Sequence, residues 1–275
     1  MNSIMKNRRK KLTWYSSLLS AIICLAFASL PASASAWKEC KGNKIRWNKS
    51  GTNMYISTTS FPIGSSWDAR LQNAMWHWNN VKGSKFQFFV GRDTDGRHSA
   101  KNGVNEIYGS STGAGSAIAV TKRRAFCYWS FGWKQGLTET DIVFNTNLSW
   151  STSAYDYSRS GAPYDFEGVA LHEFGHALGL EHEDRRMASM NSFYPNSGPL
   201  GFFKEWDQHA DDRSGVRLLY GDGATETDIA ASVFKSTGGG NSDLVRNPMY
   251  VTRGADADIE FTFSNLGTSR QTFDI

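Results

Sequence analysis

The feature that most constrains this 275-residue chain is a set of three histidines within eleven positions, His172, His176 and His182, in the pattern H-E-x-x-H-x-x-G-x-x-H. Residues four apart lie on one face of an α-helix, so His172 and His176 can reach one metal ion. Gly179 can adopt the left-handed conformation that ends a helix, and the returning chain then brings His182 to the same ion. Three nitrogen ligands leave a fourth tetrahedral position for water, as in a catalytic zinc site.

Glu173 directly follows the first of these histidines, and its carboxylate can reach the water and accept its proton. The competing interpretation is an ordinary amphipathic helix whose histidines lie on its polar face. Three of the chain's six histidines fall at ligand spacing here, together with the glutamate and the glycine. That combination favours zinc.

The first 36 residues have the three parts of a secretory signal. A basic start (Lys6 to Lys11) precedes a mostly apolar run, Leu18 to Leu30, and a small-residue cleavage site at Ala34-Ser35-Ala36. The apolar run is short for a membrane span, so we expect export without a stable membrane anchor after cleavage; a retained anchor is the alternative.

The first 36 residues carry five Lys or Arg and no acidic residue, so the whole-chain net charge of +4 becomes −1 without them. Nothing in that charge favours nucleic acid as a partner.

Two cysteines remain after the signal, Cys40 and Cys127. In an oxidising compartment we expect them to form a disulfide. The alternative is that the Cys40 thiolate caps the zinc and keeps the site latent.

Hydrophobic periodicity predicts the main elements. Trp67, Leu71, Ala74, Met75 and Trp78 recur at helical spacing, which predicts a core-facing helix from Ser65 or Ser66 to about Asn80. His77 on that helix is interpreted as a surface or hydrogen-bonded histidine. A closing helix is predicted over residues 213–220. Strands are predicted at 44–47, 54–58, 85–90, 104–108, 117–121, 125–129 and 141–144.

The polar loop from Gly91 to Gly103 contains Asp93, Asp95, Gly96 and His98, which could hold a structural calcium or second zinc ion. A solvated turn is the favoured interpretation, because the spacing matches no complete ion-binding loop. From about Thr225 the composition changes. Residues 37–223 are predicted as one domain and 224–275 as a β-rich tail, with strands at 250–252 and 259–263. The tail is either an incomplete β-sandwich module, faintly similar to bacterial adhesion modules, or an appendage of the main domain.

From about Lys44 to Gly221 the sequence resembles the metzincin zinc proteases, and among them most closely the matrixins. The zinc motif carries the resemblance, and the stretches Thr138–Asn145 and Asp212–Gly221 support it. The resemblance implies an α+β fold, with a twisted, mixed and mostly parallel sheet, the zinc helix at the floor of a cleft, and a C-terminal subdomain below. It also implies a methionine-containing turn under the metal. Met190 has the matrixin spacing, and Met187 is the second choice.

The sequence departs from the matrixin pattern at three points. Glu183 stands where matrixins usually have serine, and the turn from Ser189 to Pro195 is two residues longer before Tyr-Pro. No cysteine-containing propeptide motif precedes the domain. The resemblance implies Tyr194 as the nearest candidate to contact the oxyanion or substrate.

These observations predict a secreted zinc endopeptidase that cleaves proteins or peptides by a zinc-activated water, with Glu173 as general base. An extended peptide is expected to add as a strand along residues 117–121. The alternative is a secreted binding or adhesion protein that uses the zinc domain as a scaffold. The oligomeric state and bond preference stay open.

Overall fold

The structure is a computed structural model that describes residues 36–94, 96, 98, 101–153, 163–183, 188–192, 208–221, 229–236 and 259–265. Its centre is a five-stranded sheet in the order β5-β4-β6-β8-β7. The strands are β4 (Gly51–Ser57), β5 (Gln87–Asp93), β6 (Glu106–Ser110), β7 (Ala119–Trp129) and β8 (Trp133–Asn145). All neighbours are parallel except β7 and β8. The expected α+β fold with a mixed, mostly parallel sheet is confirmed.

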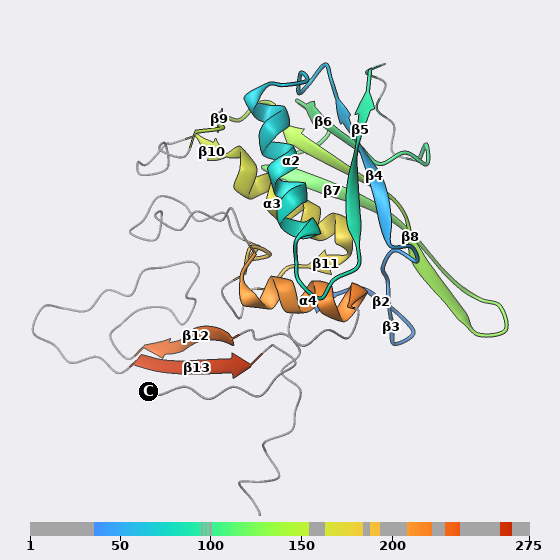
Figure 1. Cartoon of the computed structure of the whole chain (residues 1–275), viewed down its shortest axis with the longest axis vertical. Helices are drawn as coiled ribbons and strands as arrows, with labels where there is room; N and C mark the ends of the chain where they lie inside the picture. The colour runs from blue at the N-terminus through green and yellow to red at the C-terminus, as the bar shows by residue number, and fades with distance from the viewer. Residues whose placement is uncertain are drawn as a thin grey trace, which may run out of the picture. The chain divides into compact units, whose positions relative to one another are not determined.

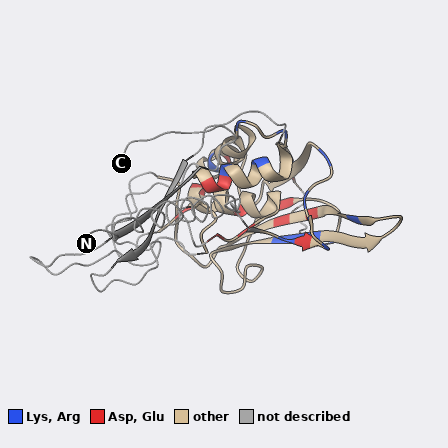
Figure 2. Cartoon of the chain, turned by 90° about the horizontal axis from the view of Figure 1, so that it is seen from below, with Lys and Arg blue, Asp and Glu red and all other residues tan. Residues whose placement is uncertain are grey.

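Two helices, α2 (Ser66–Asn79) and α3 (Phe166–Leu178), cover one side of this sheet (Figures 1 and 2). The start of α2 is set by Ser65, whose hydroxyl accepts a hydrogen bond from the Asp68 N–H at 3.2 Å. The apolar positions predicted for its inner face are buried, with Trp67 partly buried beside them. The core therefore lies between the sheet and these helices, and it holds α3 against the strands.

The hairpin of β7 and β8 differs from the prediction. Separate short strands were expected over 117–121 and 125–129, but β7 is continuous, with a bulge between Arg124 and Ala125. β8 runs eight residues further toward its N-terminus than predicted. Polar residues interrupt the alternating pattern because the far half of the hairpin extends beyond the helices (Figure 1), where it covers no core. At its tip, Phe131 is fully exposed with φ of 46°.

Several two-residue strands complete the main domain. They are β1 (Ala36–Trp37), β2 (Glu39–Cys40), β3 (Asn43–Lys44), β9 (Trp150–Ser151), β10 (Tyr164–Asp165) and β11 (Leu180–Glu181). The strand predicted at 44–47 is thus largely wrong. There the chain leaves the β2–β3 hairpin, and Trp47 is buried with its Nε1 donating to the Ala177 carbonyl at 2.9 Å.

Helix α4 (Ala210–Tyr220) begins three residues before the predicted start, so Asp211 and Asp212 lie inside its first turn. In the tail, β12 (Ile229–Ser236) pairs antiparallel with β13 (Ile259–Asn265). β13 confirms the strand predicted at 259–263, β12 was not predicted, and residues 250–252 lie outside the described residues. Among the described helices, none has both the length and the apolar character needed to cross a membrane.

Candidate metal centre

Helix α3 and the turn that follows it bring His172, His176 and His182 together. Their Nε2 atoms converge, with His182 lying 3.3 Å from His172 and 3.1 Å from His176. Gly179 ends the helix with φ of 108°, a left-handed conformation that favours glycine, and it turns the chain toward His182. The structure thus brings together the three histidines that the motif predicted as ligands.

The spacing of these nitrogens fits a zinc ion. Two ligands at the Zn–N distance of about 2.0–2.1 Å, at a tetrahedral angle, lie about 3.3 Å apart. The two Nε2 distances match that value, and the three ligand atoms form a group that could hold a metal ion. His182 is exposed and the other two are partly buried, so the centre opens to solvent on one side.

Backbone carbonyls orient two of the imidazoles. His172 Nδ1 lies 2.7 Å from the Ser189 carbonyl oxygen, and His176 Nδ1 lies 2.9 Å from the Leu180 carbonyl oxygen. A carbonyl oxygen can only accept, so each Nδ1 carries the hydrogen and each Nε2 keeps its lone pair for a metal. Burial, followed by the neighbouring His172, lowers the pKa of His176 well below its ordinary value. That residue is therefore neutral, as a metal ligand must be.

Glu173 lies on the buried side of the same helix, with 5% of its surface exposed. Its Oε2 accepts a hydrogen bond from the Thr121 hydroxyl at 2.6 Å. Burial raises the pKa of Glu173 to about 7, while the Thr121 hydrogen bond and the proximity of His182 act in the opposite direction. A carboxylate with a pKa near neutrality is suited to accepting and returning a proton.

Strand β7 supplies two residues that the sequence did not identify. Thr121 holds Glu173, and the Arg123 guanidinium reaches the turn after α3. Arg123 Nη1 donates to the Leu180 carbonyl at 3.2 Å, and its Nη2 pairs with Glu181 Oε1 at 2.5 Å. β7 is the last strand of its sheet, next to α3. Both residues therefore connect the exposed edge of the sheet to the metal centre.

Met190, the methionine that the resemblance proposed for the turn under the metal, packs against Gly175 of helix α3. It is 1% exposed, and a Cβ atom built on Gly175 would lie only 2.2 Å from its sulfur. Glycine between Glu173 and His176 is thus needed for the close approach of this methionine. Glu183 holds the same turn through its backbone, because its N–H donates to the Met190 carbonyl at 2.9 Å and its carbonyl accepts from the Asn191 amide.

Asp212, in the first turn of α4, anchors this turn from the other side. Its carboxylate accepts N–H groups from Ser189 at 2.7 Å, His209 at 2.9 Å and Met190 at 3.1 Å. Ser189 is also the residue whose carbonyl orients His172. Asp212 therefore supports a metal-site histidine through one intervening residue, a role that its sequence position does not reveal.

Of the other predicted site residues, some are described by the structure and others lie outside the described residues. Cys40 and Cys127 form a disulfide, with Cα atoms 5.9 Å apart, so the Cys40 sulfur is not available to cap a metal. Tyr194 and Met187, the possible oxyanion contact and the second methionine, lie outside the described residues, as does Asp95. His77 Nε2 lies 3.9 Å from Glu167 Oε1, and His77 belongs to neither group of three potential ligands among the described residues.

The sequence is similar to a known protein family and to several of its members. The sequence model described as matrixin matches residues 46–221, which include the five-stranded sheet and helices α2, α3 and α4. Matrix metalloproteinase-25 of Homo sapiens is 38% identical over 81 residues, 30% of this chain and 13% of that protein. Stromelysin-3 of Xenopus laevis is 34% identical over 83 residues, covering 30% of this chain and 15% of the relative.

A plant protein, Metalloendoproteinase 4-MMP of Arabidopsis thaliana, is 38% identical over 73 residues, 26% of this chain and 20% of that relative. The chain therefore spans a fifth or less of the length of each of these three relatives.

Proposed function

This chain belongs to the matrixin family, and from that premise we propose that it is a zinc-dependent endopeptidase with Glu173 as its general base. The observation that carries the proposal is the convergence of three Nε2 atoms at zinc spacing beside a buried carboxylate. His172, His176 and His182 are the proposed ligands. A zinc ion bound there would supply a Lewis acid that polarises the scissile carbonyl and lowers the pKa of water to about 7.

The protein's own residues then move the proton. Glu173 accepts it from the attacking water and delivers it to the leaving amine nitrogen, so no covalent enzyme intermediate is required. Thr121 fixes the orientation of the Glu173 carboxylate through Oε2. The Nδ1 contacts of His172 and His176 hold the imidazoles in place throughout the reaction.

The proposed substrate is an extended segment of a protein or peptide. β7 is an edge strand of the five-stranded sheet, and its first residues, Ala119 to Thr121, lead to the side chain that contacts Glu173. A peptide added along this edge would pair with the backbone and bring a scissile bond toward the metal centre. This retains the predicted cleft edge, with the strand beginning at Ala119 instead of Ala117.

The deciding experiment compares Glu173→Gln with the native protein, both loaded with zinc. Glutamine keeps the shape but cannot accept the proton, so we expect kcat/KM for a peptide substrate to fall by about 10²–10⁴-fold. Zinc content should stay unchanged. Glu39→Gln, at an exposed position on β2, is the matched control and should keep full activity.

Two outcomes would contradict the proposal: unchanged hydrolysis by Glu173→Gln, or no zinc in the purified protein. Unchanged biological activity of Glu173→Gln would instead support the scaffold alternative, a secreted binding or adhesion protein. The burial of Glu173 against Thr121 favours the enzyme, because a purely structural zinc site has no need of this carboxylate.

We also propose that residues 1–36 direct export and are then removed, leaving residues 37–223 as the catalytic domain and 224–275 as a separate tail. The basic start, apolar run and Ala34-Ser35-Ala36 support export. N-terminal sequencing of exported protein should begin at Trp37. Recovery of chains that retain the basic start outside the cell would refute the cleavage.

A further inference from the structure

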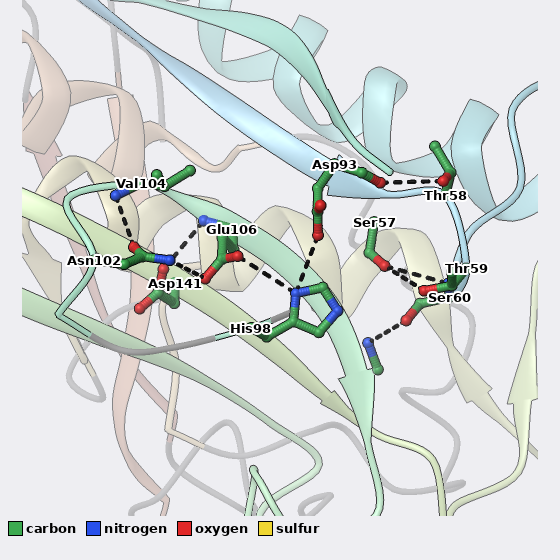
Figure 3. A network of polar contacts seen from close by, with 11 residues as sticks. Ser57, Thr58, Thr59, Ser60, Asp93, His98, Asn102, Val104, Glu106 and Asp141 are labelled. Carbon is green, nitrogen blue, oxygen red and sulfur yellow. Dashed lines mark hydrogen bonds and ion pairs between the residues drawn. The ribbon is translucent and has the colours of Figure 1, made fainter. Parts of the chain in front are cut away.

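A second group of side chains that could hold a metal ion lies where β5 ends and β6 begins, and the proposed reaction uses none of them. Asp93 is the last residue of β5, Glu106 is the first residue of β6, and β4 runs between these two strands. His98, from the connecting loop, lies between the two carboxylates (Figure 3). The chain thus brings three potential ligands together from two strands and a loop.

The distances within this group resemble those of a metal site. His98 Nδ1 lies 3.2 Å from Asp93 Oδ2 and 3.5 Å from Glu106 Oε1, and one ligand atom from each residue lies within 4.8 Å of the others. Ligands about 2.0–2.1 Å from a tetrahedral zinc ion are separated by about 3.3 Å. Both contacts of His98 are close to this spacing.

Contacts outside the group orient the side chains of His98 and Glu106 and hold the backbone of Asp93. The His98 ring stacks on the buried Tyr108 ring, with centroids 4.1 Å apart and planes within 9°. Glu106 Oε2 accepts from Asn102 Nδ2 at 3.1 Å, which directs Oε1 toward His98. The Asp93 backbone carbonyl accepts from the Thr58 N–H at 2.9 Å. Such surrounding contacts are typical of ligands that are held ready for a metal.

The alternative to a metal site is an ion-pair network in which a protonated His98 pairs with the two carboxylates. Within the part of the chain that the structure describes, His98 Nδ1 makes no hydrogen bond of acceptable geometry despite its burial. An imidazolium between two carboxylates should direct an N–H at one of them. The absence of such a hydrogen bond fits a neutral ligand nitrogen better than an imidazolium.

Charge also favours a divalent ion. The side chains of His98, Asp93 and Glu106 are only 14%, 11% and 5% exposed. Glu139 and Asp141, also buried, add two further acidic groups on the neighbouring strand β8. Apart from Lys122, whose charge acts on Asp141, one imidazolium supplies a single positive charge to this region, whereas a divalent cation supplies two. Uncompensated buried charges are costly, so the larger charge matches the surroundings better.

We propose that Asp93, His98 and Glu106 bind a second zinc ion, which fastens the loop between β5 and β6 to the sheet. The imidazole nitrogen decides between metals, because calcium takes six to eight oxygen ligands whereas zinc accepts a mixed set of four. Water would complete the set. The sequence had suggested Asp93 and His98 for such an ion, but Glu106 stands eight residues after His98 on a predicted strand and was missed.

The test counts metal ions per chain by mass spectrometry after dialysis of zinc-loaded protein. We expect two zinc ions in the native protein, one in His98→Gln, and one in the double variant His172→Gln/His176→Gln. His77→Gln is the matched control, since this histidine lies 3.9 Å from a buried carboxylate but belongs to no three-ligand group in the described chain; it should bind two.

This experiment can refute the second zinc site and the proposed catalytic site independently of each other. If the double variant binds no zinc and His98→Gln binds as much as the native protein, the second site is refuted and the catalytic one stands. If the double variant binds as much as native protein, the catalytic assignment fails instead. Circular dichroism establishes that His98→Gln is folded. Should it unfold, X-ray absorption of the double variant gives the answer, because one nitrogen among oxygen ligands is expected and any other donor set contradicts the proposal.

Discussion

The Thr121 hydroxyl group donates a hydrogen bond to the carboxylate of the proposed general base, Glu173. Burial raises the pKa of Glu173 to about 7, and the hydrogen bond from Thr121 opposes that increase. Glu173 must be ionised to accept a proton, so activity should fall as the pH decreases through its pKa. Thr121→Val removes the donor with little change in volume, and we expect it to move the acidic limb of the kcat/KM profile to higher pH.

The measurement is the pH profile of peptide hydrolysis between pH 5 and pH 9. Thr138→Val is the control, because Thr138 lies on the same hairpin and its exposed hydroxyl donates to the Arg124 carbonyl, away from Glu173. An acidic limb that stays in place in Thr121→Val, or moves equally in both variants, would contradict the role given to Thr121.

At the scale of elements, helix α4 and the methionine turn form one unit through Asp212. Burial, with a smaller effect from the neighbouring Asp211, raises the pKa of Asp212 to about 7, while its three backbone hydrogen bonds act in the opposite direction. Its pKa is higher in the folded than in the unfolded state, so the folded protein binds the extra proton. The free energy of unfolding should therefore rise as the pH falls from 8 toward 5, by at most about 1.4 kcal/mol per pH unit from this residue.

Asp212→Asn should remove that contribution. It should also destabilise the protein by about 1–3 kcal/mol, because the new amide group cannot accept the N–H groups that the lost oxygen accepted. Urea unfolding of metal-free protein at pH 5 and pH 8 measures both effects, with Glu39→Gln controlling for the loss of one negative charge. An unchanged difference between the two pH values would show that Asp212 does not titrate as described.

Comparison of these elements with the sequence shows which features can be predicted. The proposed ligands His172, His176 and His182 were identifiable because their geometry is set within one helix and one turn. Thr121, Arg123 and Asp212 act on that site from distant segments, through contacts that exist only after folding. Helix α2 was found from its buried stripe. The hairpin of β7 and β8 was predicted as separate short strands, because its far half covers no core and therefore lacks the alternation of apolar and polar residues that indicates a strand.

For the whole molecule, the Cys40–Cys127 disulfide joins the first described strands to the long hairpin across 87 residues of sequence. A cross-link closing so long a loop reduces the entropy of the unfolded chain. Replacing both cysteines with serine should lower the free energy of unfolding by about 2–4 kcal/mol. Urea unfolding of the variant and of native protein with and without reductant measures this loss, and coincident transitions would contradict it.

That disulfide has a further consequence for the cell that makes the protein. Thiols stay reduced in a cytoplasm, and the cross-link forms only in an oxidising compartment. Under the proposed export, the chain is thus weaker where it is synthesised than where it acts. On that proposal, chains that fail to leave the cell should be degraded faster than exported ones, which would limit the activity of the peptidase inside the producing cell.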